Sequence, residues 1–288
     1  MHLRLALVLC TIASAACERE PAAVTVVDVP SVSARSSAEP AAQVPTAAAA
    51  PAETFKGFPG WVGFATVEGT SKADAPANAA AHVALSEQPQ VWAALGSASR
   101  LRALAPGFSE AVGFVATTKI AFGCDGGEQE FAFFKGEQRP PRGAVWLVPP
   151  ATPAAVVGVV EIPAAEVPAF LRAAGPNELR AWQVGDHWVF VVRRTEKAIT
   201  AEAWEAQTRI WQDENEWRPM EGDDAGPPSL AQGGPGMPEP RMLLVAGDAR
   251  LLVVQTDGYE GTNFTGLQLE KGSARWAEGR LYLYWCAF

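Results

Sequence analysis

Two segments of the sequence share one plan, in which an apolar run is followed by a Gly-Asp pair and then by a second run rich in valine. The Gly-Asp pairs are residues 185–186 and 247–248, and the flanking runs are 179–184 with 187–193 and 242–246 with 249–255. Apolar runs separated by two turn residues are typical of tight β-hairpins. A chain that repeats this unit is expected to fold mainly as antiparallel β-structure.

Other β-like runs occur elsewhere in the chain. We expect them to form strands at 61–67, 111–122, 128–134, 143–148 and 156–162. The last two are predicted to pair across the proline-rich link 149–153. The segment 198–212 fits a strand or a helix, and the alternation around Trp204 favours a strand. Residues 241–288 hold four short strands, too few to stand alone, so they must complete a sheet begun earlier.

Apolar residues at helical spacing predict two helices. One covers 91–105 and ends at Pro106-Gly107, and the other is a short helix at 163–174 that ends at Gly175-Pro176. The predicted fold class is therefore α+β but mainly β. We expect an antiparallel sheet, or a sandwich of hairpins, with one or two helices packed against it.

The N-terminus has the three parts of an export signal. A weakly basic start at 1–4 precedes an apolar run at 5–12, and small residues fill 13–16. This order predicts a signal peptide over 1–16. Its apolar run is too short to span a bilayer permanently.

Cys17 follows directly on Ser14-Ala15-Ala16. This arrangement resembles the lipobox of bacterial lipoproteins. The resemblance implies that Cys17 is lipidated and becomes the new N-terminus, which would anchor the protein in the cell envelope. Glu18 in the next position implies the outer membrane, with the protein facing the periplasm or the cell surface. Ordinary signal cleavage is the alternative, because Ala13-Ser14-Ala15 also fits the small-x-small pattern.

Cysteine arithmetic favours lipidation. The sequence has four cysteines, and Cys10 leaves with the signal peptide. If Cys17 carries lipid, Cys124 and Cys286 remain, and an exported chain can join them in a disulfide. Cys124 sits at the mouth of the hairpin predicted around Asp125-Gly126. Cys286 lies in a final strand, 279–288, whose two sides are both largely apolar, so we expect this strand to be buried and fixed by the disulfide.

Composition divides the mature chain. Residues 17–54 are rich in Ala, Pro, Val and Ser with few aromatics, which predicts a disordered tether. Residues 55–288 are predicted to form a single β-rich domain with an irregular loop at 213–240. The net charge of −9 comes without a basic patch, which argues against nucleic acid and anionic lipid headgroups as partners. The expected partners are the membrane, through the lipid, and an envelope protein or glycan.

No catalytic, metal or cofactor site is predicted. His82 and His187 stand far apart without partners at ligand spacing, which argues against zinc or haem. Ser109 follows Gly107 without the second glycine of a nucleophile elbow. The acidic residues of 213–240 do not match a calcium loop and are interpreted as solvated charges. The sequence thus favours a binding or structural module over an enzyme, with a hydrolase that lacks a sequence signature as an alternative.

Ten tryptophans suggest a second function. Exposed aromatic rings beside acids and amides form sugar-binding surfaces, although packing in the core is the favoured interpretation. The candidate ligand-binding residues are Trp182, Trp188, Asp257, Tyr259 and Glu260. The alternative function is therefore a glycan-binding or glycan-hydrolysing protein that uses a Trp-rich face.

Overall fold

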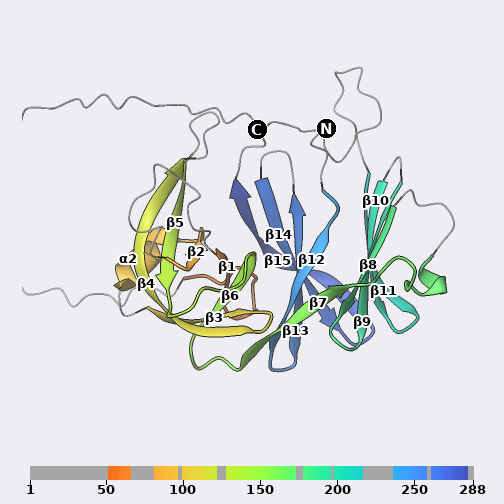
Figure 1. Cartoon of the computed structure of the whole chain (residues 1–288), viewed down its shortest axis with the longest axis horizontal. Helices are drawn as coiled ribbons and strands as arrows, with labels where there is room; N and C mark the ends of the chain where they lie inside the picture. The colour runs from red at the N-terminus through yellow and green to blue at the C-terminus, as the bar shows by residue number, and fades with distance from the viewer. Residues whose placement is uncertain are drawn as a thin grey trace, which may run out of the picture. The chain divides into compact units, whose positions relative to one another are not determined.

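Antiparallel strands make up most of the structure, a computed structural model (Figure 1). The residues that it describes are 51–65, 81–96, 99–121, 128–172, 178–195, 198–216, 236–257 and 261–284. The strands form a closed barrel and a nine-stranded sheet, and the described residues include one α-helix. The predicted fold class, α+β but mainly β with antiparallel pairing, is confirmed.

Six strands close the barrel in the order β1-β2-β5-β4-β3-β6. They are β1 (Trp61–Ala65), β2 (Val83–Leu85), β3 (Arg100–Ala105), β4 (Phe108–Ala121), β5 (Glu128–Lys135) and β6 (Ala144–Val148). The predicted hairpin of 111–122 with 128–134 is confirmed as β4 and β5. Helix α2 (Pro89–Leu95) contacts these two strands and buries Trp92.

The predicted helix over 91–105 is wrong in its second half. The helix ends at Leu95, and the strand β3 begins at Arg100. Leu101 and Ala103 face the barrel interior, whereas Leu104 packs on the opposite side, so the alternation of a strand fits this segment better than a helical stripe. The pair Pro106-Gly107 is the turn between β3 and β4, with Gly107 at a φ of 71°.

The second sheet has the order β11-β10-β9-β8-β7-β12-β13-β14-β15. Its strands are β7 (Ala154–Glu161), β8 (Glu178–Val184), β9 (Trp188–Arg194), β10 (Ala198–Glu205), β11 (Thr208–Glu216), β12 (Glu239–Ala246), β13 (Ala249–Asp257), β14 (Gly261–Glu270) and β15 (Ser273–Tyr284). The two Gly-Asp hairpins are confirmed as β8–β9 and β12–β13. The ambiguous segment 198–212 falls within the hairpin of β10 and β11.

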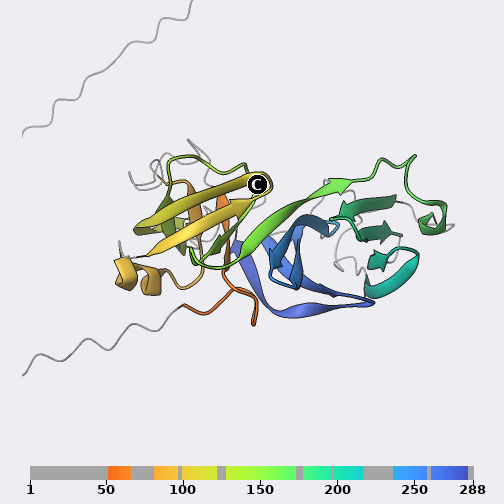
Figure 2. The same cartoon turned by 90° about the horizontal axis from the view of Figure 1, so that it is seen from below.

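Three other predictions are corrected. β6 and β7 are both strands, but they do not pair, because β6 lies between β1 and β3 while β7 pairs with β12 and β8. The link 149–153 therefore joins the barrel to the sheet rather than closing a hairpin (Figure 2). The helix predicted at 163–174 is reduced to one 3-10 turn, η2 (Ala169–Leu171), within the described part of that segment. The loop predicted at 213–240 is shorter, because β11 extends to Glu216 and β12 begins at Glu239.

Strands β12 and β13 separate two hydrophobic cores. Leu243 and Leu252 pack on one side with residues of β8, β9 and β10, and Leu244 and Leu251 pack on the other side with barrel residues such as Trp146. A strand buried on both faces carries a continuous apolar run rather than an alternating one. The sequence MLLVA in β12 fits this position.

The final predicted strand, 279–288, begins earlier than expected, since β15 starts at Ser273. Leu281 is buried, but Tyr282, which points to the opposite face of the strand, is 40% exposed. The expectation that both faces are buried is therefore wrong for the described part of this strand. Cys17, Cys124 and Cys286 lie outside the described residues.

Candidate functional site

A cleft opens where β7 changes its partner. From Ala154 to Gly158 this strand pairs with β12, and from Val159 to Glu161 it pairs with β8. The first residues of β12 thus lie beyond its ladder with β7. The cleft there has a volume of about 160 Å³, and its lining comes from β8, β12, β13 and the residues just before β12: Glu178, Arg180, Gly236, Met237, Glu239, Arg241, Gln255 and Asp257.

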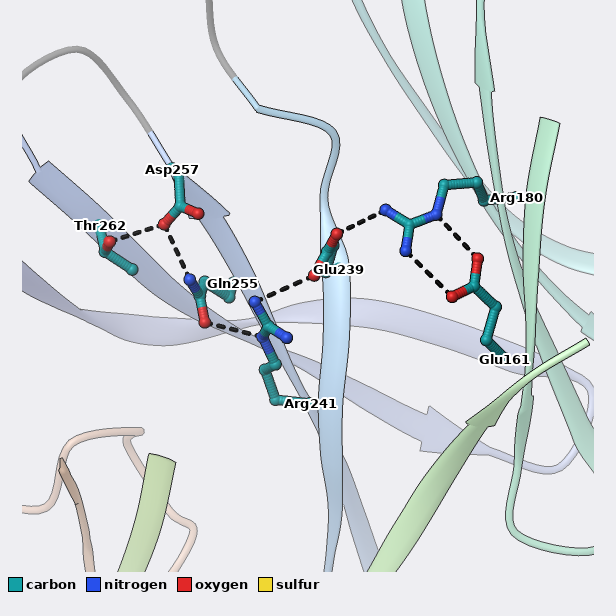
Figure 3. A network of polar contacts seen from close by, with 7 residues as sticks. All are labelled: Glu161, Arg180, Glu239, Arg241, Gln255, Asp257 and Thr262. Atoms are coloured by element: carbon teal, nitrogen blue, oxygen red, sulfur yellow. Dashed lines mark hydrogen bonds and ion pairs between the residues drawn. The ribbon is translucent and has the colours of Figure 1, made fainter. Parts of the chain in front are cut away.

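Arg180 bridges the two sides of this cleft. Its Nε and Nη2 donate to the two carboxylate oxygens of Glu161, at 2.9 and 3.1 Å, and its Nη1 donates to Oε1 of Glu239 (Figure 3). The guanidinium carbon also lies 4.8 Å from the centre of the Trp182 ring, a cation–π contact. Arg180 thus links the end of β7 to the start of β12 through side chains where the backbone ladder has stopped.

Arg241 continues the network towards β14. A β-bulge between Pro240 and Met242 leaves Arg241 without a register partner in β13, and bulges of this kind redirect side chains. Its Nη2 lies 2.9 Å from Oε2 of Glu239, and its Nε donates to Oε1 of Gln255 at 2.7 Å. The network therefore places both arginines on the same carboxylate, that of Glu239.

Asp257 ends the chain of contacts. Its Oδ1 accepts hydrogen bonds from Nε2 of Gln255, at 2.8 Å, and from the Thr262 hydroxyl, at 2.6 Å. Its main-chain oxygen accepts from the N–H of Gly236 at 2.6 Å, which holds the segment before β12 against β13. Seven side chains from five strands are thus joined across one region of the sheet (Figure 3).

The ion pairs keep their groups charged. Hydrogen bonds from Arg180 lower the pKa of Glu161 below its usual value, and the carboxylates of Glu161 and Glu239 raise the pKa of Arg180. Bidentate pairing of a guanidinium with a carboxylate is a strong and directional form of hydrogen bonding. The cleft therefore has a fixed arrangement of charge near neutral pH.

The structure brings part of the predicted ligand-binding set to this cleft. Asp257 lines it, and Trp182 lies under Arg180 but is only 5% exposed. Trp188 packs against the hydrophobic core on one side of β12 rather than in the cleft. Tyr259 and Glu260 lie outside the described residues.

The tryptophans do not form an exposed row in the part of the chain that the structure describes. Four of them are buried: Trp61, Trp92, Trp146 and Trp182. The most exposed is Trp276, at 38%, whose ring packs edge-on against Trp211 at 4.9 Å and whose indole N–H donates to Asp213. Packing accounts for most of these rings, as the composition favoured.

Sequence reasoning missed Glu161, Arg180, Glu239 and Arg241. The local signal was a charged residue at every second position of a strand otherwise rich in apolar residues, as at Glu178 and Arg180, or on both sides of Pro240. Such residues are typical of the solvent-facing side of a strand. Their convergence depends on β7 switching between two strands that are far apart in the sequence.

A second carboxyl group with a perturbed pKa lies beside the barrel. The hydroxyl of Thr54 donates to Glu87 at 2.6 Å and accepts from the N–H of Val62 at 2.9 Å. Burial of the carboxyl group raises the pKa of Glu87 to about 7. Gln88, next in sequence, exchanges two hydrogen bonds of 3.1 Å with the backbone of Ala52. Residues 51–54, predicted as the end of the tether, are thus packed on the barrel.

Among the described residues, no group of three or more His, Cys, Asp or Glu side chains is placed to hold a metal ion. No helix in the described segments is long and apolar enough to cross a membrane. No protein-family model matches the chain, and comparisons with the curated proteins and with the solved structures give no match.

Proposed function

We propose that the protein is a lipid-anchored binding module of the bacterial cell envelope, which binds a small polar ligand in the cleft between β8 and β12. The observation that carries the binding function is the cleft itself, a hollow of about 160 Å³ lined by charged side chains. Ion pairs between strands hold these side chains in place before a ligand arrives (Figure 3). Groups fixed in this way lose little entropy on binding, which favours affinity and selectivity.

The anchor is proposed from the sequence, through the signal peptide and the lipobox-like residues that end at Cys17. The described residues begin at Pro51, and the sequence places 33 residues between Cys17 and Pro51, all of them in the segment predicted as a tether. At roughly 3 Å per extended residue, a stretch of this length reaches on the order of 100 Å. A tethered binding module would therefore sample the space near its membrane.

Mass analysis of the intact mature protein, with and without reduction, tests the anchor and the disulfide together. We expect an acylated N-terminal Cys17 that is lost in Cys17→Ala, and a mass increase of two hydrogens on reduction for the pair Cys124 and Cys286. An unmodified N-terminus created by cleavage elsewhere would contradict the anchor. It would leave the binding function to be judged by the cleft alone.

A screen by thermal shift and NMR tests the binding function. The probes are butylamine, butyrate, inorganic phosphate and oligomers of N-acetylglucosamine, each at matched ionic strength. We expect at least one probe to bind the wild type saturably and to lose its effect in Glu178→Trp, which fills the cleft. Glu166→Trp, at an exposed position outside the cleft lining, is the control.

Two results of this screen would overturn the proposed function. One is that no probe perturbs residues of the cleft. The other is that the oligosaccharide binds at Trp276 and keeps its affinity in Glu178→Trp, because this result would favour the glycan-binding alternative. Trp276 is the most exposed tryptophan among the described residues, so it is the position where a sugar could stack.

A further inference from the structure

We propose that the cleft binds a primary ammonium group on a short alkyl chain, as carried by a small diamine or by a lysine side chain. This proposal rests on the binding function proposed above and adds the chemical class of the ligand. Some polar atoms of the cleft are already paired within the protein, and others are open to a ligand.

The positive groups of the cleft are largely used within the protein. All three side-chain nitrogens of Arg180 donate to Glu161 or Glu239. Arg241 directs its Nε to Gln255 and its Nη2 to Glu239. An anionic ligand would have to compete with Glu161 and Glu239 for Arg180, and with Glu239 for Arg241, of which only Nη1 makes no hydrogen bond or ion pair with another described residue. The cleft is therefore poorly suited to a carboxylate or phosphate.

Acceptor atoms remain open. The carboxylate of Glu178 lines the cleft and makes no hydrogen bond or ion pair with another described residue, and the same holds for Oδ2 of Asp257. The charges also favour a cation. Three carboxylates (Glu178, Glu239 and Asp257) and two guanidinium groups (Arg180 and Arg241) line the cleft, which leaves a net charge of −1. The carboxylate of Glu161, paired with Arg180 outside this lining, adds a further negative charge nearby.

The shape and chemistry of the cleft favour an amine over a metal ion. The described residues include no group of three carboxylate, imidazole or thiolate ligands placed around one point. An ammonium group needs less, because it has three donors that can reach separate acceptors. The buried side chain of Met237, 6% exposed, offers an apolar contact for an alkyl chain. The volume of about 160 Å³ is enough for several groups of the size of a water molecule.

Ligand titrations followed by protein NMR test the proposal. The probes are butylamine, 1,4-diaminobutane, N-acetyl-lysine methylamide and, as matched anion, butyrate, with calcium chloride as the metal probe. We expect saturable shifts from the amines that map to Gln255, Asp257 and neighbouring residues. Glu178→Gln should weaken amine binding at least about fivefold, as expected for a lost charge-assisted hydrogen bond.

Controls separate binding from folding. The carboxylate of Glu178 makes no hydrogen bond or ion pair with another described residue, so Glu178→Gln should keep the wild-type unfolding midpoint. Glu166→Gln removes one negative charge from an exposed position outside the cleft and should leave amine affinity unchanged. Equal weakening in both variants would show a general charge effect and would overturn the proposed site.

The probes also distinguish the failure of this proposal from the failure of the binding function. Butyrate or calcium binding in the cleft, without amine binding, would overturn the ligand class and leave the binding function intact. Binding of no probe in the cleft would overturn both. Tighter binding of the free diamine supports a small-molecule ligand, and tighter binding of the lysine derivative supports a lysine side chain of a partner protein. Either result supports the ammonium chemistry.

Discussion

Glu87 beside the barrel and Glu161 beside the cleft both join two segments of the chain, but their pKa values move in opposite directions. Glu87 contacts the Thr54 hydroxyl, and burial of its carboxyl group raises its pKa to about 7. Glu161 is more exposed, and two hydrogen bonds from Arg180 lower its pKa. The two carboxyl groups thus differ in the dominant cause: burial outweighs the hydrogen bond from Thr54 and raises the pKa of Glu87, whereas the hydrogen bonds from Arg180 outweigh burial and lower the pKa of Glu161.

The two shifts have opposite consequences for stability. Because the folded-state pKa of Glu87 lies above its ordinary 4.5, its contribution to stability is complete below pH 4.5 and is lost as pH rises through about 7. The folded-state pKa of Glu161 lies below 4.5, so its contribution is complete above pH 4.5 and is lost as pH falls through the folded pKa.

Glu87→Gln should give the largest change. At pH 8 the wild-type carboxyl is ionised in a poorly hydrated position, and the neutral amide can still accept the hydrogen bond from Thr54. We expect the free energy of unfolding to increase by about 2–3 kcal/mol at pH 8, and to change little at pH 5. Urea denaturation at the two pH values measures this difference.

Glu137→Gln, at an exposed glutamate, is the matched control for Glu87→Gln and should show no such dependence on pH. If the difference in unfolding free energy between Glu87→Gln and wild type were the same at pH 5 and at pH 8, the pKa of Glu87 would not be raised. The contrast with Glu161 would then be lost.

Arg180→Gln should have the next largest effect. Its loss leaves Glu161 without its guanidinium partner and leaves Glu239 paired with Arg241 alone. We expect a loss of about 1–2 kcal/mol at pH 7, because this network is only partly exposed. Chemical denaturation measures the loss. Arg180→Lys keeps the charge without the bidentate geometry and should fall between wild type and Arg180→Gln. A lysine variant as stable as wild type would show that charge alone is sufficient.

Glu161→Gln should have a smaller effect. The side chain of Glu161 is 49% exposed, so solvent screening limits the ion pair to about 0.5 kcal/mol or less at pH 7. The difference from wild type should shrink as pH falls through the folded-state pKa of Glu161, because the carboxyl is then protonated in the folded state as well. Denaturation over a series of pH values from 7 down to the acid limit of the folded state checks this trend, and a difference that grows on acidification would contradict the sign assigned to Glu161.

Glu278→Gln should have the smallest effect. Glu278 pairs with Lys56 at 2.7 Å, but both side chains are about three-quarters exposed. Exposed pairs of this kind contribute little, since water screens both charges. The unfolding midpoint should equal that of wild type at low and at high salt. A clear destabilisation at low salt would show that this pair helps to hold residues 51–60, alongside the contact of Thr54 with Glu87.

Local sequence signals predicted much of the sheet. The pairs at 185–186 and 247–248 identified two hairpins, because Gly at φ 57° in both pairs suits a tight turn whatever lies around it. The helix predicted at 91–105 failed beyond Leu95. Leu101 and Leu104 suit a helical stripe in sequence, but they contact different cores on the two sides of a strand.

One residue that lines the cleft was predicted from the sequence. Asp257 was selected together with Trp182, because acids and tryptophans near one another suit a binding surface, and the structure places Asp257 in the cleft and Trp182 beneath Arg180. Trp188 was also predicted as a ligand-binding residue, but it packs against a hydrophobic core and does not line the cleft. Arg180 and Glu239 could not be paired from sequence, since 59 positions separate them and no periodicity links them.

Strands β7 and β12 show where sequence ends and tertiary structure begins. The apolar runs at 154–160 and 242–246 determined by themselves that both segments would be strands near turn-forming residues. Only the tertiary structure decided that Leu243 and Leu244 would be at most 2% exposed while Val157 and Val160 are 37% and 65% exposed. The reason is physical: the strand conformation is set by local alternation and turns, whereas the pairing of β7 with β12 and the burial of each face depend on strands that are distant in the sequence.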